Sequence, residues 1–135
     1  MKFKTANNSN KKWKNKVQKG KDAENIVKDY LEKNGYKIIS TNFRSKYSEI
    51  DIVGISPENI LCFFEVRSGE VFDPIETINK RKIGKVLEGA LDFISKIQWD
   101  GDIRFDIVIV TKNKNKFDIN HIPSAFSLDD YPDNL

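Results

Sequence analysis

The sequence has one cysteine and one histidine among its 135 residues. Cys62 lies inside an apolar run, so we expect a buried thiol. No CxxC or Cys/His cluster is present to hold zinc or an iron-sulfur cluster. His121 lies far from the candidate acids in sequence, and we expect a structural role for it. No apolar run approaches the roughly 20 residues that cross a bilayer, and the N-terminus does not resemble a signal peptide. We therefore expect a cytoplasmic protein without a membrane partner.

Acidic residues are absent from residues 1–21, which contain eight lysines. The rest of the chain carries 15 basic and 20 acidic residues, so a stretch of charge +8 precedes a region of charge −5. Residues 1–19 have few large apolar side chains to offset their ordering entropy, which predicts a mobile basic arm. Such an arm either attracts polyanions or keeps the protein soluble. Residues 20–127 have the size of one domain, and an acidic tail follows at 128–135.

Hydrophobic periodicity predicts two helices and five strands. The apolar stripe of residues 20–34 and the longer stripe of residues 76–97 are typical of helices. Residues 41–48 form a polar connection, and the turn at 56–59 makes a hairpin of the strands on either side of it. The β-branched run 104–111 is typical of a strand buried on both faces, reached by a parallel crossover. The expected strands are residues 36–40, 49–55, 60–67, 104–111 and 117–122. The order αβββαβ(β) predicts an α/β protein with a central mixed sheet flanked by helices.

Acids gather in the predicted hairpin. Glu49 and Asp51 share one face of its first strand, and Glu65 and Arg67 share one face of the second. If the turn is a three-residue loop with a left-handed Asn59, Asp51 pairs with Glu65 and their Cβ atoms lie about 5 Å apart. Two buried carboxylates repel each other, and a divalent cation would offset that repulsion. The alternatives are that one acid faces solvent or pairs with Arg67, or that the register is shifted by one residue.

Other polar residues lie within reach of this hairpin. Glu24, at the edge of the first helix stripe, could supply a third acid, although an exposed pair with Lys28 is the plainer interpretation. The long helix carries a basic cluster near its beginning, where cations are unfavourable for the helix dipole and an external anion would relieve them. A solvated helix face is the alternative. In the connection before the acidic strand, Arg44 and Tyr47 could contact a nucleic-acid strand. The basic cluster consists of Lys80, Arg81, Lys82 and Lys85.

Several ordered motifs resemble those of one bacterial family, the YraN-like proteins. Residues 48–53 (SEIDIV) are similar to its GEIDL segment, and residues 63–68 (FFEVRS) to its FVEVK segment. The resemblance extends over roughly residues 20–126. Four further segments carry it: 20–35 with Ala23 and Glu24, 42–44 (NFR), the lysine-bearing helix 79–90 and the strand 104–108 (RFDIV), followed by a closing motif at 122–126.

The resemblance implies a restriction-endonuclease-like core, similar to Holliday-junction resolvases and other PD-(D/E)XK nucleases. It implies that Glu24, Asp51, Glu65 and the backbone carbonyl of Val66 bind Mg or Mn. Glu49 would then either support these ligands or serve as an alternative ligand. Arg67 then stands at the lysine position of the ExK motif, where its guanidinium cannot act as a general base but can bind phosphate. Ser48 replaces the glycine that the family usually has before the acid pair.

Three functions follow from these observations. The first is a metal-dependent endonuclease acting on DNA, rather than RNA, including branched DNA. The second is a catalytically inactive nucleic-acid-binding module of the same fold. In the first two hypotheses, the phosphates of the nucleic acid are contacted by Lys80, Lys82 and Lys85. The third is a protein-interaction scaffold, which does not explain why two acids are predicted to lie opposite each other. Relatives with such a core often form homodimers, and the sequence identifies no dimer surface.

Overall fold

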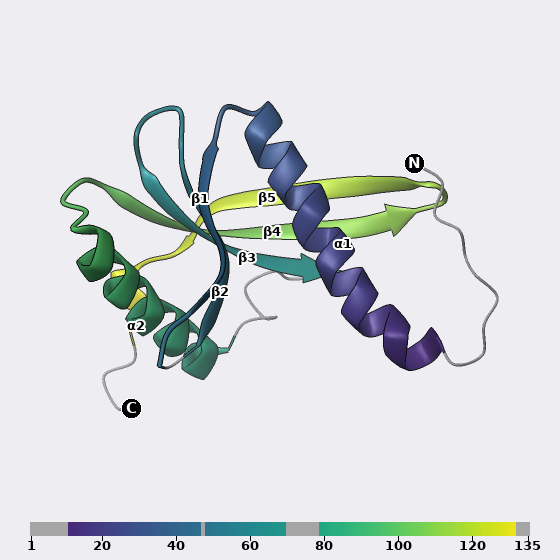
Figure 1. The fold of residues 1–135 in the computed structure, drawn as a ribbon, viewed down its shortest axis with the longest axis horizontal. Helices are drawn as coiled ribbons and strands as arrows, with labels where there is room; N and C mark the ends of the chain where they lie inside the picture. The colour runs from purple at the N-terminus through teal and green to yellow at the C-terminus, as the bar shows by residue number, and fades with distance from the viewer. Residues whose placement is uncertain (1–10, 47, 70–78, 132–135) are drawn as a thin grey trace.

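The computed structural model describes residues 11–46, 48–69 and 79–131, with side chains from residue 22 onward. The chain forms a five-stranded sheet in the order β1-β2-β3-β4-β5 (Figure 1). β3 and β4 are parallel, and the other neighbours are antiparallel. The predicted α/β class with a mixed sheet is confirmed, and the order αβββαββ is consistent with a restriction-endonuclease-like core. The elements are α1 (Lys11–Lys33), β1 (Lys37–Arg44), β2 (Glu49–Ile55), β3 (Leu61–Ser68), α2 (Lys80–Ile97), β4 (Ile103–Asn113), β5 (Lys116–Phe126) and the 3-10 helix η1 (Leu128–Asp130).

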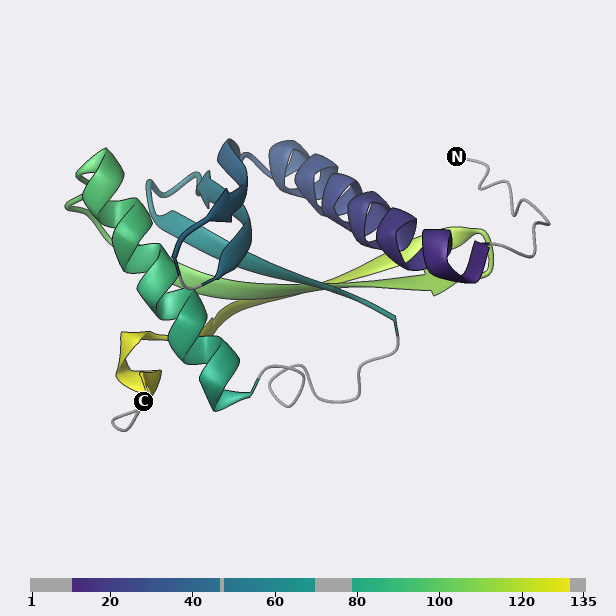
Figure 2. The ribbon, with the colours of Figure 1, turned by 60° about the horizontal axis from the view of Figure 1, so that its bottom comes forward.

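The two helices cover opposite faces of the sheet (Figure 2). On the α1 face, Ala23, Val27 and Leu31 of the helix pack against buried strand residues such as Phe64 and Val108. On the α2 face, the apolar stripe of α2 packs against a larger set of strand residues. β4 is buried from Phe105 to Val110, with alternate residues in the two clusters, as its β-branched run predicts. The residues of the α2-face cluster include Leu61, Phe63, Phe105, Ile107 and Ile109 from the strands and Ile83, Val86, Leu87, Ala90 and Phe93 from α2.

Several element boundaries differ from the prediction. β4 and β5 continue to Asn113 and Phe126, which lie two and four residues past their predicted ends. The first helix begins at Lys11 rather than Gly20, so residues 11–19 of the predicted arm are helical. Lysine and glutamine favour helix moderately but leave no apolar stripe, so periodicity alone could not reveal this part. β1 continues to Arg44 through part of the predicted connection, with an irregularity in its pairing between Ile38 and Ser40. β1 is an edge strand and mostly exposed, so its outer half lacks the apolar alternation of a core strand.

Some predictions concern residues that the structure does not describe. These are the first ten residues of the arm, Tyr47, residues 76–78 of the predicted long helix and residues 132–135 of the acidic tail. In the described part of the chain, no helix is both long enough and apolar enough to span a bilayer.

A polar network is buried where β4, β5 and α1 meet. Asp106 is fully buried and accepts hydrogen bonds from Arg104 Nε at 2.9 Å, His121 Nε2 at 2.7 Å and the Ser124 backbone N–H at 3.0 Å. Arg104 also donates to the Tyr36 hydroxyl at 2.6 Å, and the Tyr30 hydroxyl lies 3.1 Å from His121 Nδ1. The network therefore ties both strands to the first helix and to the start of β1, and it gives His121 the structural role expected of it.

The network determines the charge state of Asp106. Burial alone would raise the pKa of this carboxyl, but the hydrogen bonds from His121 and Arg104 outweigh burial, and the pKa lies below its ordinary value. The acid is therefore ionised at neutral pH with its charge fully compensated.

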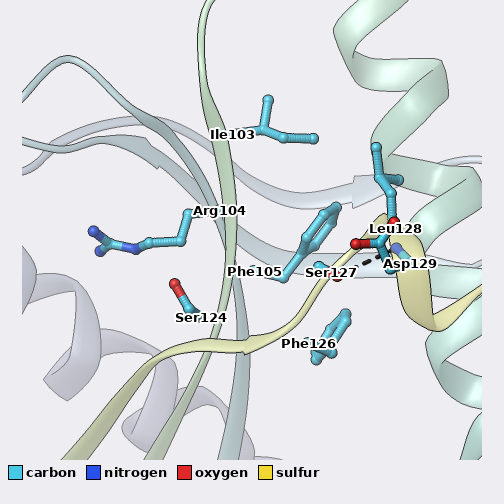
Figure 3. Close-up of a pocket in the computed structure, with 8 residues that line it drawn as sticks. All are labelled: Ile103, Arg104, Phe105, Ser124, Phe126, Ser127, Leu128 and Asp129. Carbon is cyan, nitrogen blue, oxygen red and sulfur yellow. Dashed lines mark hydrogen bonds between the residues drawn. The ribbon is translucent and has the colours of Figure 1, made fainter.

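A shallow pocket of about 270 Å³ opens beside this network, at the other side of β4 (Figure 3). Its apolar wall includes Phe105, Phe126 and Leu128, while the side chain of Arg104 points away from them. Neither Asp51 nor Glu65 lines this pocket, so it is separate from the predicted acidic site.

We predict that Asp106→Asn lowers the free energy of unfolding at pH 7 by about 3 to 5 kcal/mol, because it removes the buried charge that neutralises the partly buried Arg104. The folded pKa of Asp106 lies below the unfolded value. Its stabilisation is thus complete above about pH 4 and is lost as pH falls through the folded pKa. Urea denaturation between pH 3 and pH 7 measures both effects, and the exposed Asp100→Asn is the control. Equal stability of Asp106→Asn and wild type at pH 7 would contradict the prediction.

Candidate functional site: a carboxylate pair between β2 and β3

The β2–β3 hairpin has the predicted register. Ser56 N–H donates to the Ile60 carbonyl at 2.9 Å, Asn59 has a left-handed φ of 66°, and Ile55 pairs with Leu61. The pairing continues to Ile52 opposite Phe64 and ends there. Asp51 and Glu65 are the next residues along the two strands, so they occupy the first position after the ladder ends.

The strands separate at Asp51. Ile50 and Val53 both pack in the α2-face cluster while Ile52 packs in the α1-face cluster, so the alternation of β2 is interrupted between Ile50 and Ile52. The Asp51 carboxylate bridges to β3, where its Oδ2 accepts the Val66 backbone N–H at 2.8 Å. A side-chain oxygen thus takes the role that a backbone carbonyl has elsewhere in the ladder, and the carboxylate is fixed beside Glu65.

Glu65 is buried on the α2 face and lies near two cations. Its Oε1 is 3.4 Å from Arg67 Nη2 on the same strand and 3.8 Å from Lys82 Nζ on α2. Both distances exceed the 2.7 to 2.9 Å typical of charge-assisted hydrogen bonds, so these are loose ion pairs. Arg67 Nε is buried and donates to no acceptor in the described part of the structure. The alternative that one acid pairs with Arg67 is therefore realised in this structure.

The two carboxyl groups are electrostatically unfavourable neighbours. Burial, followed by the charge of Asp51, raises the pKa of Glu65 to about 7. Burial also raises the pKa of Asp51, although the Val66 N–H and the positive charge of Lys82 oppose the effect. Glu49 adds a further negative charge that raises the pKa of Asp51. Carboxyl groups with raised pKa values in a cluster of charges are common at functional sites.

Close packing between α2 and the start of β2 brings Lys82 to this site. The side chain of Asn79 caps the helix by accepting the Lys82 N–H at 2.9 Å. A Cβ at Gly89 would lie 3.1 Å from Ser45 Oγ and 3.2 Å from Ser48 Oγ, so a larger residue there would push the helix away. Ser48 Oγ also donates to the Lys85 carbonyl at 3.0 Å. The serine that replaces the expected glycine thus helps to hold α2 against the sheet.

The other predicted metal ligands are not part of the pair. Glu24 is half-buried on α1, which covers the opposite face of the sheet from α2. Across residues 22–46, 48–69 and 79–131, no three His, Cys, Asp or Glu side chains are grouped so that they could hold a metal ion. Glu24 and the Val66 carbonyl therefore remain predicted ligands, and what the structure brings together is two carboxylates.

The predicted nucleic-acid contacts are distributed around the site. Lys82 lies at the carboxylate pair, whereas Lys80 and Lys85 are exposed on α2. Arg44 is exposed at the end of β1, where its Nη2 is 3.8 Å from Glu49 Oε2. Cys62 is a buried thiol, as predicted, and burial raises its pKa to about 12, so it is not a nucleophile at neutral pH.

Sequence reasoning missed how Arg104, Asp106 and His121 act together. A charged pair inside an otherwise β-branched strand was a usable signal, because a buried acid requires partners. The lone histidine in the following strand was the natural partner, and their register places His121 opposite Val108, two residues beyond Asp106.

Comparison with known proteins agrees with the order of motifs. The model of the uncharacterised protein family UPF0102 matches residues 23–110. A UPF0102 protein of Sulfurihydrogenibium sp. is 42% identical over 123 residues, covering 84% of this chain and 98% of the relative. UPF0102 proteins of Flavobacterium psychrophilum and Bacteroides thetaiotaomicron are 34% and 38% identical, each over 79% of this chain and at least 90% of the relative. The resemblance to the YraN-like proteins is thus confirmed, and the chain belongs to the uncharacterised family UPF0102.

Proposed function

We propose that the chain is a divalent-metal-dependent endonuclease that hydrolyses phosphodiester bonds in DNA. The observation that carries the proposal is the pair formed by the half-buried Asp51 and the buried Glu65, whose pKa values are both raised and which lie beside two cations. A protein gains no stability from such a pair, because each carboxylate opposes the ionisation of the other. A bound cation would offset the repulsion between the two carboxylates, and a bound phosphate would pair with the two protein cations.

The donor set fits a divalent cation. Magnesium commonly takes one or two carboxylates from a protein and completes its shell with waters and substrate phosphates. Asp51 and Glu65 would hold Mg or Mn. Their raised pKa values mean that each carboxyl is protonated more readily than usual, and a bound cation would favour the ionised form of both. When bound, such an ion lowers the pKa of a water and neutralises charge on the scissile phosphate.

Arg67 and Lys82 have a different role in the proposal, which is to bind phosphate. The guanidinium of Arg67 stays protonated and cannot accept a proton from the attacking water. It can stabilise negative charge on the phosphate oxygens, and its buried Nε is a donor that has no acceptor among the described residues. The loose contacts of both cations with Glu65 allow them to turn towards a phosphate.

A specific observation also favours a second candidate, a nucleic-acid-binding module that does not cleave. Glu65 already lies near two protein cations, and the described residues group no third acid with the pair. In that case the cations would bind phosphate and the acids would only position them. The two candidates differ in whether the pair takes up a metal ion and in whether cleavage occurs.

We predict that Asp51→Asn and Glu65→Gln each lower metal-dependent cleavage more than about a hundredfold, because each removes an interaction worth several kcal/mol. DNA binding should survive, since both changes are nearly isosteric. The assay incubates the protein with linear, single-stranded and four-way-junction DNA under manganese and under a chelator. Glu58→Gln, an equal change of charge in the exposed turn of the same hairpin, is the matched control. Cleavage that persists in both site variants would refute the assignment of activity to this pair.

Metal binding is tested separately by thermal unfolding. Manganese at about 100 times its dissociation constant should stabilise the wild type by about 2.7 kcal/mol. Asp51→Asn and Glu65→Gln should lose this stabilisation, and Glu58→Gln should keep it. A wild-type melting temperature that does not respond to manganese or magnesium would favour the non-cleaving module.

Arg67 variants test whether charge or proton transfer matters at this position. Arg67→Gln should lower cleavage about tenfold to a thousandfold, as expected for the loss of one donor to a developing charge. Arg67→Lys should retain more activity than Arg67→Gln, because it keeps the positive charge. Equal rates for wild type and Arg67→Gln in single-turnover cleavage would show that the guanidinium does not contact the scissile phosphate.

A further inference from the structure

The β4–β5 hairpin extends past the rest of the sheet. β3 ends at Ser68, opposite Val110, while β4 and β5 continue to the pair Asn113 and Lys116. The hairpin runs out to one end of the molecule, the end at which α1 also begins (Figure 1). The extension therefore starts close to the carboxylate pair and leads away from it.

One face of the extension is a polar track, which is separated from Glu65 by the buried apolar residues Ile107 and Ile109. Ile107 of β4 is next to Glu65 in the parallel ladder and packs in the α2-face cluster. Strand alternation puts Ile109, Thr111 and Asn113 on the same face of β4, with their β5 partners beside them. These partners are Asn120, Asp118 and Lys116, which are all exposed, as is Asn113. The α2 face is thus apolar under the helix and polar beyond it.

The end of this track is strongly basic. Lys112, Lys114 and Lys116 lie within five residues at the tip, and the two-residue turn is formed by Lys114, with a φ of 56°, and Asn115. The first eleven residues of α1 contain six lysines and no acid. At the opposite end of the molecule, the turn between α2 and β4 carries Asp100 and Asp102. This separation of charge would orient a polyanion along the molecule.

We propose that the β4–β5 hairpin is a docking arm for duplex DNA, gripping the phosphate backbone through Lys114 and Lys116. The inference rests on the proposed function and deepens it by naming a duplex as the substrate. Asn113 lies six positions after Ile107 along β4, which corresponds to about 20 Å of strand. A duplex rises about 3.4 Å per base pair. The lysines therefore hold phosphates about six base pairs from the phosphate at Asp51 and Glu65.

The chemistry of the track favours a duplex over a single strand. Proteins that bind single strands stack bases on exposed aromatic side chains. Of the exposed residues of the track, the asparagines and Lys116 suit contacts with phosphate and sugar, whereas Asp118 would repel phosphate.

The test is binding of the full chain to a fluorescent 20-base-pair duplex, measured by anisotropy without metal over a range of salt concentrations. The variant is Lys114→Asn with Lys116→Gln, in which asparagine tolerates the left-handed backbone. The control is Lys33→Gln with Lys37→Gln, which removes the same charge from two exposed lysines at the other end of α1. We expect the hairpin variant to bind about tenfold more weakly at 100 mM salt, with its salt slope reduced by about 1.8. The control should retain the wild-type slope.

A second measurement separates this proposal from the proposed function. Wild-type protein is assayed with duplexes that extend three, six, nine or twelve base pairs beyond the cut on one side. Cleavage should fall steeply below six base pairs, and the hairpin variant should lose this dependence on length. Weaker binding of the hairpin variant without cleavage by any form supports the arm and refutes the nuclease. Two outcomes would overturn the docking arm even where cleavage occurs. One is equal binding of the duplex by the hairpin variant, the control and the wild type. The other is an affinity of the wild type for a 20-base single strand that equals its affinity for the duplex.

Discussion

Repulsion between the carboxylates of Asp51 and Glu65 is the constraint around which the site is built. A second buried acid shows that the fold can hold a carboxylate without such conflict. Asp106 accepts hydrogen bonds of 2.7 to 3.0 Å from three partners, and its pKa is lowered. Glu65 has only ion pairs of 3.4 and 3.8 Å, and its pKa is raised. One acid is fully satisfied by the protein and stabilises the fold, whereas the other is incompletely satisfied and is suited to a ligand.

The separation of β2 from β3 makes this incomplete satisfaction possible. In a continuous ladder the two acids would lie in a regular sheet, with backbone groups bonded to each other. Because the ladder ends at Ile52 and Phe64, the Asp51 carboxylate is drawn into the backbone of β3 at Val66. Gly89 and Ser48 then hold α2 against the sheet near this opening. The position of Lys82 therefore depends on the close approach of α2 to the sheet, and the position of the two carboxylates depends on where the β2–β3 ladder ends.

Most of the framework could be predicted from the sequence, because it depends on local patterns. The turn at 56–59 fixes the hairpin register, and the β-branched run of β4 indicates burial on both faces. The outer half of β1 and the start of α1 could not be predicted, since neither carries an apolar pattern. The end of the β2–β3 ladder was also hidden, because no local sequence pattern marks the point at which the two strands part. For the same reason the sequence placed Asp51 and Glu65 together but did not determine what neutralises them.

In the proposed function, Arg67 and Lys82 each have two possible anionic partners, Glu65 and a substrate phosphate. This competition links the binding of the two proposed ligands, the metal ion and the phosphate. These cations cannot fully neutralise Glu65 and bind a phosphate at the same time. A divalent ion held by the carboxylates would release both of them for phosphate, and a bound phosphate would draw both away from Glu65 and leave it free for the ion. Each ligand would therefore strengthen the binding of the other by the same factor, as linkage requires. In the absence of both, the protein cations limit the cost of the buried acids, which explains how the fold tolerates them.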